Sequence, residues 1–174
     1  CIENLLNNIP KQREKDGAHA IHEHWRPADG EERLRVVAAL ALAMQEKGYK
    51  RSQRSAIVMG WDEMAALLPK EWSKEQRNGY LAWLSGPSGV LTDRSDGTLT
   101  FAHLSFQEYL CAWRLASTVE GIEERVKAFR DHLWDPDWWE TLRLWAALLG
   151  AKNPEGLDDV LRGITDAESG GLGL

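Results

Sequence analysis

One β-hairpin pattern, in residues 89–103 (GVLTDRSDGTLTFAH), most constrains the fold of this chain, because the other segments have mainly helical periodicity. Apolar and polar side chains alternate on both sides of Asp96-Gly97, a dipeptide typical of the tight turn between two antiparallel strands. The sequence therefore predicts one pair of short strands set among helices, which makes the expected fold class mainly α.

The segment before the hairpin begins with a long helix. Residues 30–48 have apolar side chains at helical spacing, and Gln45 stands in the same stripe. Asp29 is placed as the N-cap of this helix, and Gly48 as the residue just beyond its end.

A short strand and two more helices are predicted between that helix and the hairpin. Residues 55–59 (SAIVM) are typical of a strand, and residues 61–68 of a helix that Pro69 ends. Ser73 and Gln76 have the spacing of a capping box, so the next helix begins there. The order helix, strand, helix, helix, hairpin is that of a winged-helix domain, a variant of the helix-turn-helix.

The helix after the hairpin completes this domain. Ser105 and Glu108 have the S-x-x-E spacing of a capping box, which predicts a helix that begins at Ser105. Satisfying backbone N–H groups explains both side chains without a catalytic role. We therefore expect residues 31–118 to form a winged-helix domain, helices plus a β-hairpin wing.

The helical spacing of apolar side chains in residues 119–174 predicts a C-terminal helical domain. This domain is expected to be either a bundle or the start of a helical repeat region. Asp135-Pro136 is typical of the start of a helix, and Gly150 is typical of the end of one. Residues 165–174 are expected to form a tail, which is a candidate for flexibility. Four tryptophans within twelve residues predict a packed helical face rather than surface (Trp134, Trp138, Trp139 and Trp145). Three apolar stripes predict the helices themselves (Ile122, Val126, Phe129 and Leu133; Trp138, Leu142, Trp145 and Leu149; Leu157, Val160, Leu161 and Ile164).

Composition sets limits on partners and location. The chain has 174 residues, of which 43% are hydrophobic, and a formal net charge of −6, so a bulk attraction to nucleic acid or anionic lipid is not expected. No run of about 18 apolar residues occurs, so no membrane contact is expected. Two cysteines, Cys1 and Cys111, make no disulfide framework, which favours a reducing, cytoplasmic setting. Because Cys1 opens the chain without a methionine or a signal-peptide pattern, we expect a piece of a longer protein.

No constellation in the sequence indicates that this chain is an enzyme, and no catalytic residue is assigned. Neither the P-loop pattern G-x-x-x-x-G-K-[ST] nor G-x-G-x-x-G occurs. A nucleophilic pair of Cys111 and His103 is poorly placed, because Cys111 lies on the apolar side of a helix. A metal site is not predicted, because the histidines of the N-terminal polar segment have no cysteine or second histidine pair at ligand spacing nearby (His19, His22 and His24).

Residues 99–116 (LTFAHLSFQEYLCAWRLA) resemble the NACHT-type STAND NTPases, the relatives of animal NOD-like receptors. That family carries F-x-H-x-S-F-Q-E-[YF], with an alanine after it, at the end of its winged-helix domain. The resemblance covers about residues 31–149, including the helix LRVVAALALAM and the tryptophan-rich helix WWETLRLWAALL. Eight positions of the motif coincide (Phe101, His103, Ser105, Phe106, Gln107, Glu108, Tyr109 and Ala112).

This resemblance implies a regulatory part of a larger NTPase. The family's NTPase core, with its P-loop and Mg²⁺-binding acids, lies N-terminal to this region, and residues 1–30 would be the end of the preceding helical domain. In resembling proteins the winged-helix histidine contacts the β-phosphate of ADP and holds a closed, resting state, and His103 occupies that position. ADP or ATP with Mg²⁺ would belong to the parent protein, and no cofactor is expected on this chain alone.

The implied partners are the upstream NTPase domain of the same chain and further copies of the parent, which would oligomerise when the resting state opens. Resembling proteins serve in antiphage defence in bacteria and in innate immunity in animals.

Two alternative functions stay open. A winged helix can bind DNA, but Glu75 accompanies Lys74 and Arg77 in the helix that would read it, and the wing tip at residues 93–97 has two acids for one base. The best local basic cluster is Arg51 with Arg54. The second alternative is a protein-interaction scaffold built on the tryptophan-rich helices.

Overall fold

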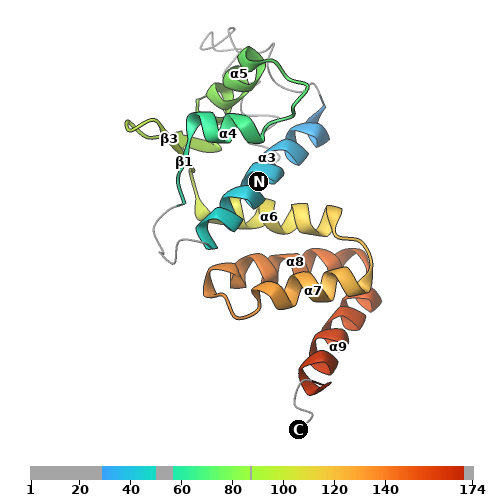
Figure 1. Cartoon of the computed structure of the whole chain (residues 1–174). Helices are drawn as coiled ribbons and strands as arrows, with labels where there is room; N and C mark the ends of the chain where they lie inside the picture. Colours follow the sequence, from blue (N-terminus) through green and yellow to red (C-terminus); the bar gives the residue numbers. More distant parts are fainter. Residues whose placement is uncertain (1–28, 50–56, 87, 171–174) are drawn as a thin grey trace. The chain divides into compact units, whose positions relative to one another are not determined.

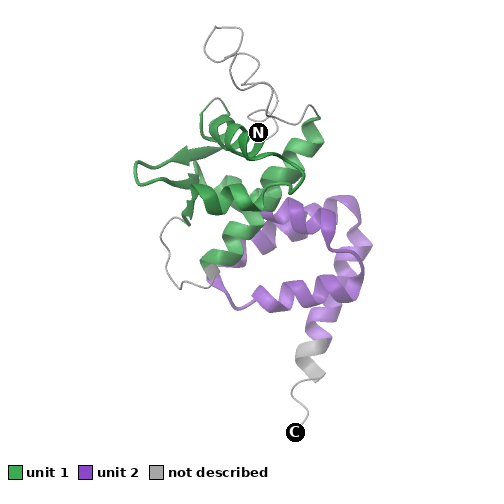
Figure 2. Ribbon diagram, turned by 45° about the horizontal axis from the view of Figure 1, so that its top comes forward, with its two compact units in different colours: residues 1–110 green, residues 111–174 purple. Residues whose placement is uncertain are grey.

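The computed structural model describes residues 29–49, 57–86 and 88–170. The chain divides into two compact units, residues 1–110 and 111–174, and each unit is described by itself (Figure 2).

The described part of the first unit has the architecture of a winged helix. Its strands form an antiparallel sheet in the order β1-β3-β2, in which Met59 pairs with Leu99 and Thr92 with Thr100. The element order is the predicted helix, strand, helix, helix, hairpin, so the expected fold class is confirmed. The elements are α3 (Gly30–Tyr49), β1 (Met59–Gly60), α4 (Trp61–Leu67), α5 (Lys74–Ser85), β2 (Leu91–Asp93), β3 (Thr98–Phe101) and the start of α6 (Leu104–Thr118) (Figure 1).

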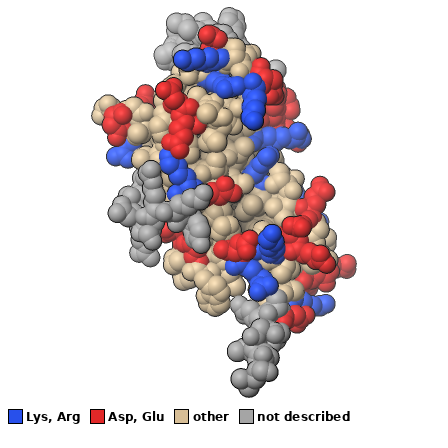
Figure 3. All heavy atoms as spheres, viewed as in Figure 1, with Lys and Arg blue, Asp and Glu red and all other residues tan. Residues whose placement is uncertain are grey.

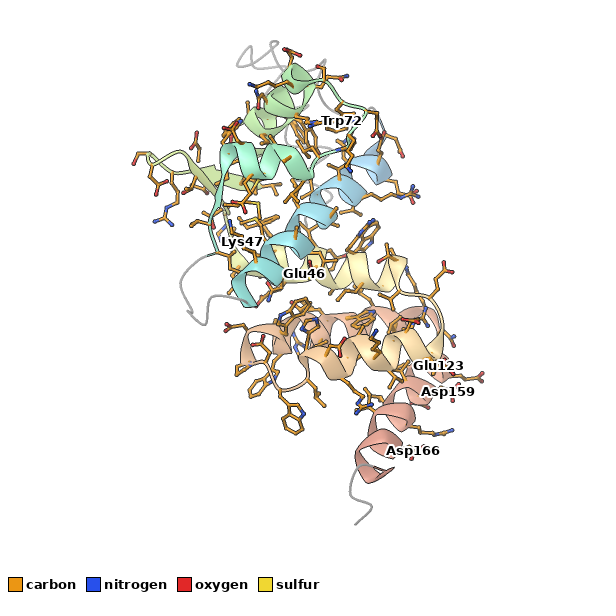
Figure 4. All side chains as sticks on the ribbon, in the orientation of Figure 1. Glu46, Lys47, Trp72, Glu123, Asp159 and Asp166 are labelled. Carbon is orange, nitrogen blue, oxygen red and sulfur yellow. The ribbon has the colours of Figure 1, made fainter. Side chains whose placement is uncertain are left out.

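The core of this unit is formed by α3, α4, α5 and the hairpin. Tyr80 stacks on Trp83 with ring centroids 5.5 Å apart, and Trp72, labelled in Figure 4, packs edge-on against Tyr80 at 5.3 Å. The Tyr80 hydroxyl donates to the carbonyl oxygen of Arg33 in α3 (3.4 Å), and burial raises the pKa of Tyr80. Other large side chains of this core are Leu40, Met44, Met64, Leu68, Leu81, Leu84, Leu91, Leu99 and Phe101.

The end of α3 is held to the elements that follow it. Lys47, near that end in Figure 4, forms an ion pair with Glu63 of α4, with 2.5 Å between Nζ and Oε2. Gly48 does not lie beyond the helix, because α3 continues to Tyr49, so that prediction was wrong. A Cβ atom on Gly48 would lie 2.8 Å from Cγ1 of Ile57, so close packing explains this glycine.

Two predicted helix caps are present. The Asp29 carboxylate accepts hydrogen bonds from the backbone N–H groups of Glu31 (3.3 Å) and Glu32 (3.2 Å) at the start of α3. Ser73 and Gln76 form the reciprocal capping box at the start of α5, with bonds of 3.2 and 2.8 Å. Both caps satisfy N–H groups that a helix start leaves without an intrahelical partner.

The third predicted cap was wrong in its position. Helix α6 begins at Leu104, one residue before Ser105. The carbonyl oxygen of His103 already accepts from the backbone N–H groups of Phe106 (3.0 Å) and Gln107 (3.5 Å), which makes His103 the N-cap residue. Ser105 therefore lies within the first turn.

The second unit is helical throughout its described part. After the last residues of α6 it contains α7 (Ile122–His132), the short 3₁₀ helix η2 (Pro136–Trp138), α8 (Trp139–Lys152) and α9 (Pro154–Gly170) (Figure 1). The Asp135 side chain accepts from the backbone N–H of Asp137 (2.9 Å), as a predicted helix start requires. Gly150 does not end its helix, because α8 continues to Lys152, and α9 extends five residues past Thr165 into the predicted tail.

The predicted tryptophan-rich face is only half correct. Trp138 and Trp145 are buried, and Trp145 stacks on Phe129 of α7 with centroids 4.3 Å apart. Trp134 and Trp139 are instead 81% and 58% exposed, because they lie off the stripe that Trp138 and Trp145 share with Leu142 and Leu149. Leu161, from the apolar stripe predicted for the last helix, is 47% exposed on α9, and Ile122, from the stripe predicted for α7, is 46% exposed.

The connection between α6 and α7 turns at Gly121, whose φ is 79°. A Cβ atom there would have no neighbour within 4 Å, so the backbone conformation and not crowding favours glycine. The guanidinium Nε of Arg125 donates to the carbonyl oxygen of Val119 across this turn (3.1 Å). None of the described helices combines the length and hydropathy that crossing a membrane requires.

Candidate functional site

The candidate site is the turn between β3 and α6, where His103 stands. Its side chain is exposed, and its ring meets Phe106 edge to face with centroids 5.0 Å apart and an interplanar angle of 85°. Among the described residues, none forms a hydrogen bond with the imidazole nitrogens of His103. A group from outside this unit can therefore reach them.

The backbone around His103 is fixed on both sides. Phe101, two residues earlier, is the last residue of β3 and is buried. The N–H of Ala102 donates to the carbonyl oxygen of Val90 at the base of the hairpin (3.0 Å). The carbonyl of His103 itself caps α6, so the side chain projects from a turn that strand and helix both hold.

Gln107 anchors the first turn of α6 to α3. Its Nε2 donates to Oε1 of Gln45 at 2.8 Å, and the two side chains are 2% and 3% exposed. The sequence placed Gln45 in an apolar helical stripe but did not identify its partner. A glutamine in such a stripe is the signal that could have indicated a buried polar contact, because buried amides are nearly always hydrogen-bonded.

The start of α6 differs in charge from the other described α-helices. Helices α3, α4, α5, α7, α8 and α9 each have an acidic residue in the first turn, whereas α6 has none. A helix N-terminus carries a partial positive charge, which acidic side chains normally neutralise. The first turn of α6 itself therefore carries no carboxylate beside the exposed imidazole, although Glu108 follows this turn directly, and the N–H groups of the turn are suited to an anion.

The other motif residues are divided between packing and surface. Ala112 is buried, Phe106, Glu108 and Tyr109 are half-buried, and Ser105 is exposed beside His103. The structure thus gives the motif two parts: buried residues that fix the helix start, and exposed residues at the turn.

The helix that would read DNA has mixed charge at its start, and its arginine side chain is held by the preceding loop. The Arg77 guanidinium is bound to the carbonyl oxygens of Pro69 (3.2 Å) and Lys70 (2.8 Å) in the loop before α5. The pKa of Glu75 is lowered by its own backbone N–H and by the Ser73 hydroxyl, so this helix start carries a carboxylate. Lys74 is exposed.

The wing tip is also acidic. Gly97 turns it with a φ of 77°, and Asp96 accepts from the hydroxyl (2.5 Å) and the backbone N–H (3.0 Å) of Thr98, which lowers the pKa of Asp96. Arg51 and Arg54 lie outside the described residues. Figure 3 shows acidic and basic side chains interspersed on the face in view, not the clustered basic footprint of a DNA-reading surface.

Two other hypotheses from the sequence concern a reactive cysteine and a metal site. Cys111 is fully buried, unlike the accessible, electropositive setting of a reactive thiolate. His19, His22 and His24 lie outside the described residues, and the part of the chain that the structure covers has no cluster of three metal-ligating side chains.

The first unit combines a small three-stranded sheet, in which β2 and β3 form the wing, with helices in the order helix, strand, helix, helix, hairpin. This arrangement defines it as a winged-helix domain. Comparison with known families then places it more closely. The chain belongs to the family of winged helix-turn-helix domains C-terminal to NACHT, whose pattern matches residues 1–115. No curated protein and no solved structure matches the chain.

Proposed function

We propose that this chain is the regulatory module of a NACHT NTPase, in which His103 contacts a phosphate of ADP bound to the preceding NACHT domain and so holds the resting state. The observation that carries the proposal is the exposed His103 imidazole, mounted on the N-cap of a helix whose first turn has no acidic residue. Membership of a family whose domain follows NACHT supplies the partner domain.

The chemistry of this contact is that of a charge-assisted hydrogen bond. An imidazole N–H donates to a phosphate oxygen, and the negative phosphate favours the protonated ring. The N-terminal end of α6 adds a fixed partial positive charge beside the same anion. The rigid turn limits the entropy that the imidazole loses on binding, because strand and helix already fix its backbone.

The contact can act as a switch only if ADP binds two arrangements of the parent protein with different affinities. ADP stabilises the closed arrangement that brings His103 to the phosphate, and its loss or exchange for ATP frees the winged helix. One hydrogen bond to a charged group contributes about 1.5–3 kcal/mol, which shifts such an equilibrium roughly ten- to hundredfold. The open parent would then oligomerise and signal in defence or innate immunity.

The test uses the parent protein with its NACHT domain. His103→Leu removes the donor and should weaken ADP roughly ten- to hundredfold in calorimetric titration, while the assembled fraction in light scattering rises. Thr92→Ala on the exposed wing is the matched control and should change neither. Unchanged ADP affinity together with an unchanged oligomeric state in His103→Leu would contradict the proposal.

A further inference from the structure

His132, the last residue of α7, is stacked on the indole ring of Trp138 in η2. The two rings are nearly parallel, with an interplanar angle of 8°, and their centroids lie 3.6 Å apart. Trp138 is 1% exposed and His132 is half-buried. The face of an indole ring is electrostatically negative, so it attracts a protonated imidazole more strongly than a neutral one.

A carboxylate lies in the same turn. The backbone N–H of Asp135 donates to the carbonyl oxygen of His132 (3.0 Å), which keeps the two residues close together. Oδ1 of Asp135 accepts from the backbone N–H of Asp137 (2.9 Å), whereas Oδ2 is buried and accepts no hydrogen bond from the described residues. A buried carboxylate oxygen is costly unless a donor or a positive charge compensates it, and a protonated His132 would supply that charge.

The position of His132 at the end of α7 also favours a positive charge. The carbonyl groups of the last turn of a helix carry a partial negative charge, which stabilises a cation there. Burial acts in the opposite direction, because it disfavours the charged ring, but His132 is half-buried and keeps part of its surface in water. We expect the helix end, the indole face and the carboxylate together to outweigh this partial burial.

The other charged side chains of the second unit are engaged elsewhere or exposed. Arg130 and Asp131, which precede His132, are exposed and line an open groove beside α9. Glu140 of α8 is half-buried and accepts from Nε of Arg143 (2.8 Å). All other charged side chains in the described part of the unit are exposed, apart from two near the turn between α6 and α7, at the other end of α7 (Arg114 and Arg125).

We propose that His132 is a proton-binding site, and that its protonated ring, stacked on Trp138 and beside Asp135, makes the turn between α7 and α8 a pH-dependent contact. The contact fixes the segment that carries the exposed Trp134 and Trp139. The proposal does not depend on the nucleotide contact of His103, because it uses residues of the second unit alone.

The direction of the pH dependence follows from the sign of the pKa change. The folded chain should hold the proton of His132 more tightly than the unfolded chain does. The resulting stabilisation is complete below the ordinary histidine pKa of about 6.5 and is lost as the pH rises through the higher folded pKa.

The first test is an NMR titration of the histidine ring protons in the full chain, with the signal of His132 assigned from its absence in His132→Phe. The pKa of His132 should lie above about 6.5. Asp135→Asn should lower it by about 1 pH unit, because the amide oxygen can still cap η2 but carries no charge. Asp137→Asn is the matched control, since it removes the same charge from an exposed side chain and should lower the pKa much less. A pKa at or below 6.5, or equal shifts in the two variants, overturns the proposal.

The second test compares thermal unfolding of the natural chain and of His132→Phe, which keeps an aromatic ring against Trp138 but cannot bind a proton. The melting temperature of the natural chain relative to the variant should rise as the pH falls from about 8.5 to about 5.5. The four other histidines are present in both chains, so their titration cancels in this difference. A difference in melting temperature that stays constant over the range also overturns the proposal.

Discussion

Gln45 of α3 and Gln107 of α6 share a hydrogen bond of 2.8 Å in the interior of the winged-helix unit. Gln107→Leu should destabilise the chain by about 1–3 kcal/mol, because it removes this partner from a buried amide. The double variant Gln45→Leu with Gln107→Leu should recover part of that loss, since both partners are then apolar. Urea unfolding of the two singles and the double gives the interaction free energy, and strictly additive losses would contradict the coupling.

The capping box of α5 should matter measurably. Ser73→Ala removes the acceptor for the Gln76 N–H and should lower the free energy of unfolding by about 1 kcal/mol. Ser95→Ala, on the exposed wing tip, is the control and should be nearly neutral. A loss in Ser95→Ala as large as in Ser73→Ala would show that the effect is not one of capping.

Tyr80 should make the first unit sensitive to alkali. Burial raises the pKa of Tyr80 above the ordinary value of about 10, so the folded state holds this proton more tightly than the unfolded state. The resulting stabilisation is complete below pH 10 and is lost as the pH rises through the folded pKa. Tyr80→Phe should flatten the fall of melting temperature above about pH 10. A Tyr80 that ionises near pH 10 while the chain stays folded, as measured by absorbance near 295 nm, would contradict this.

The tryptophans of the second unit should separate into two kinds. Trp145→Ala empties a buried site against Phe129 and should cost about 3–5 kcal/mol of stability, whereas Trp134→Ala should change it by less than about 0.5 kcal/mol. Thermal unfolding followed by circular dichroism distinguishes them. Similar losses for the two variants would mean that Trp134 is packed and not exposed.

Sequence patterns predicted the parts of the fold that depend on local chemistry. The N-caps at Asp29 and Ser73, the turn at Asp96-Gly97 and the buried stripe from Trp138 to Leu149 all follow from hydrogen bonds or spacing within a few residues. These features need no knowledge of distant segments, which is why one sequence was sufficient for them.

The errors arose where distant contacts decide the outcome. Periodicity identifies which residues share a helix face but not how much of that face is covered, so Trp134 and Trp139 were expected in a packed face although both are exposed. The glycine at position 48 was assigned to a helix end, although its neighbour is Ile57, nine residues on.

The candidate site was predictable to a limited extent. The motif resemblance pointed to His103, but neither its function as the N-cap of α6 nor the contact between Gln45 and Gln107 can be read from spacing. That contact joins residues 62 positions apart, and the sequence alone carries no information on which buried amide a glutamine meets.

Gly121 turns the chain between α6 and α7 with a φ of 79° and open space where a side chain would stand. The position therefore selects for backbone freedom and not for size. L-alanine at residue 121 would meet no neighbour but would be held at a positive φ that L side chains rarely adopt, so glycine is the residue that joins the two helices with the least strain.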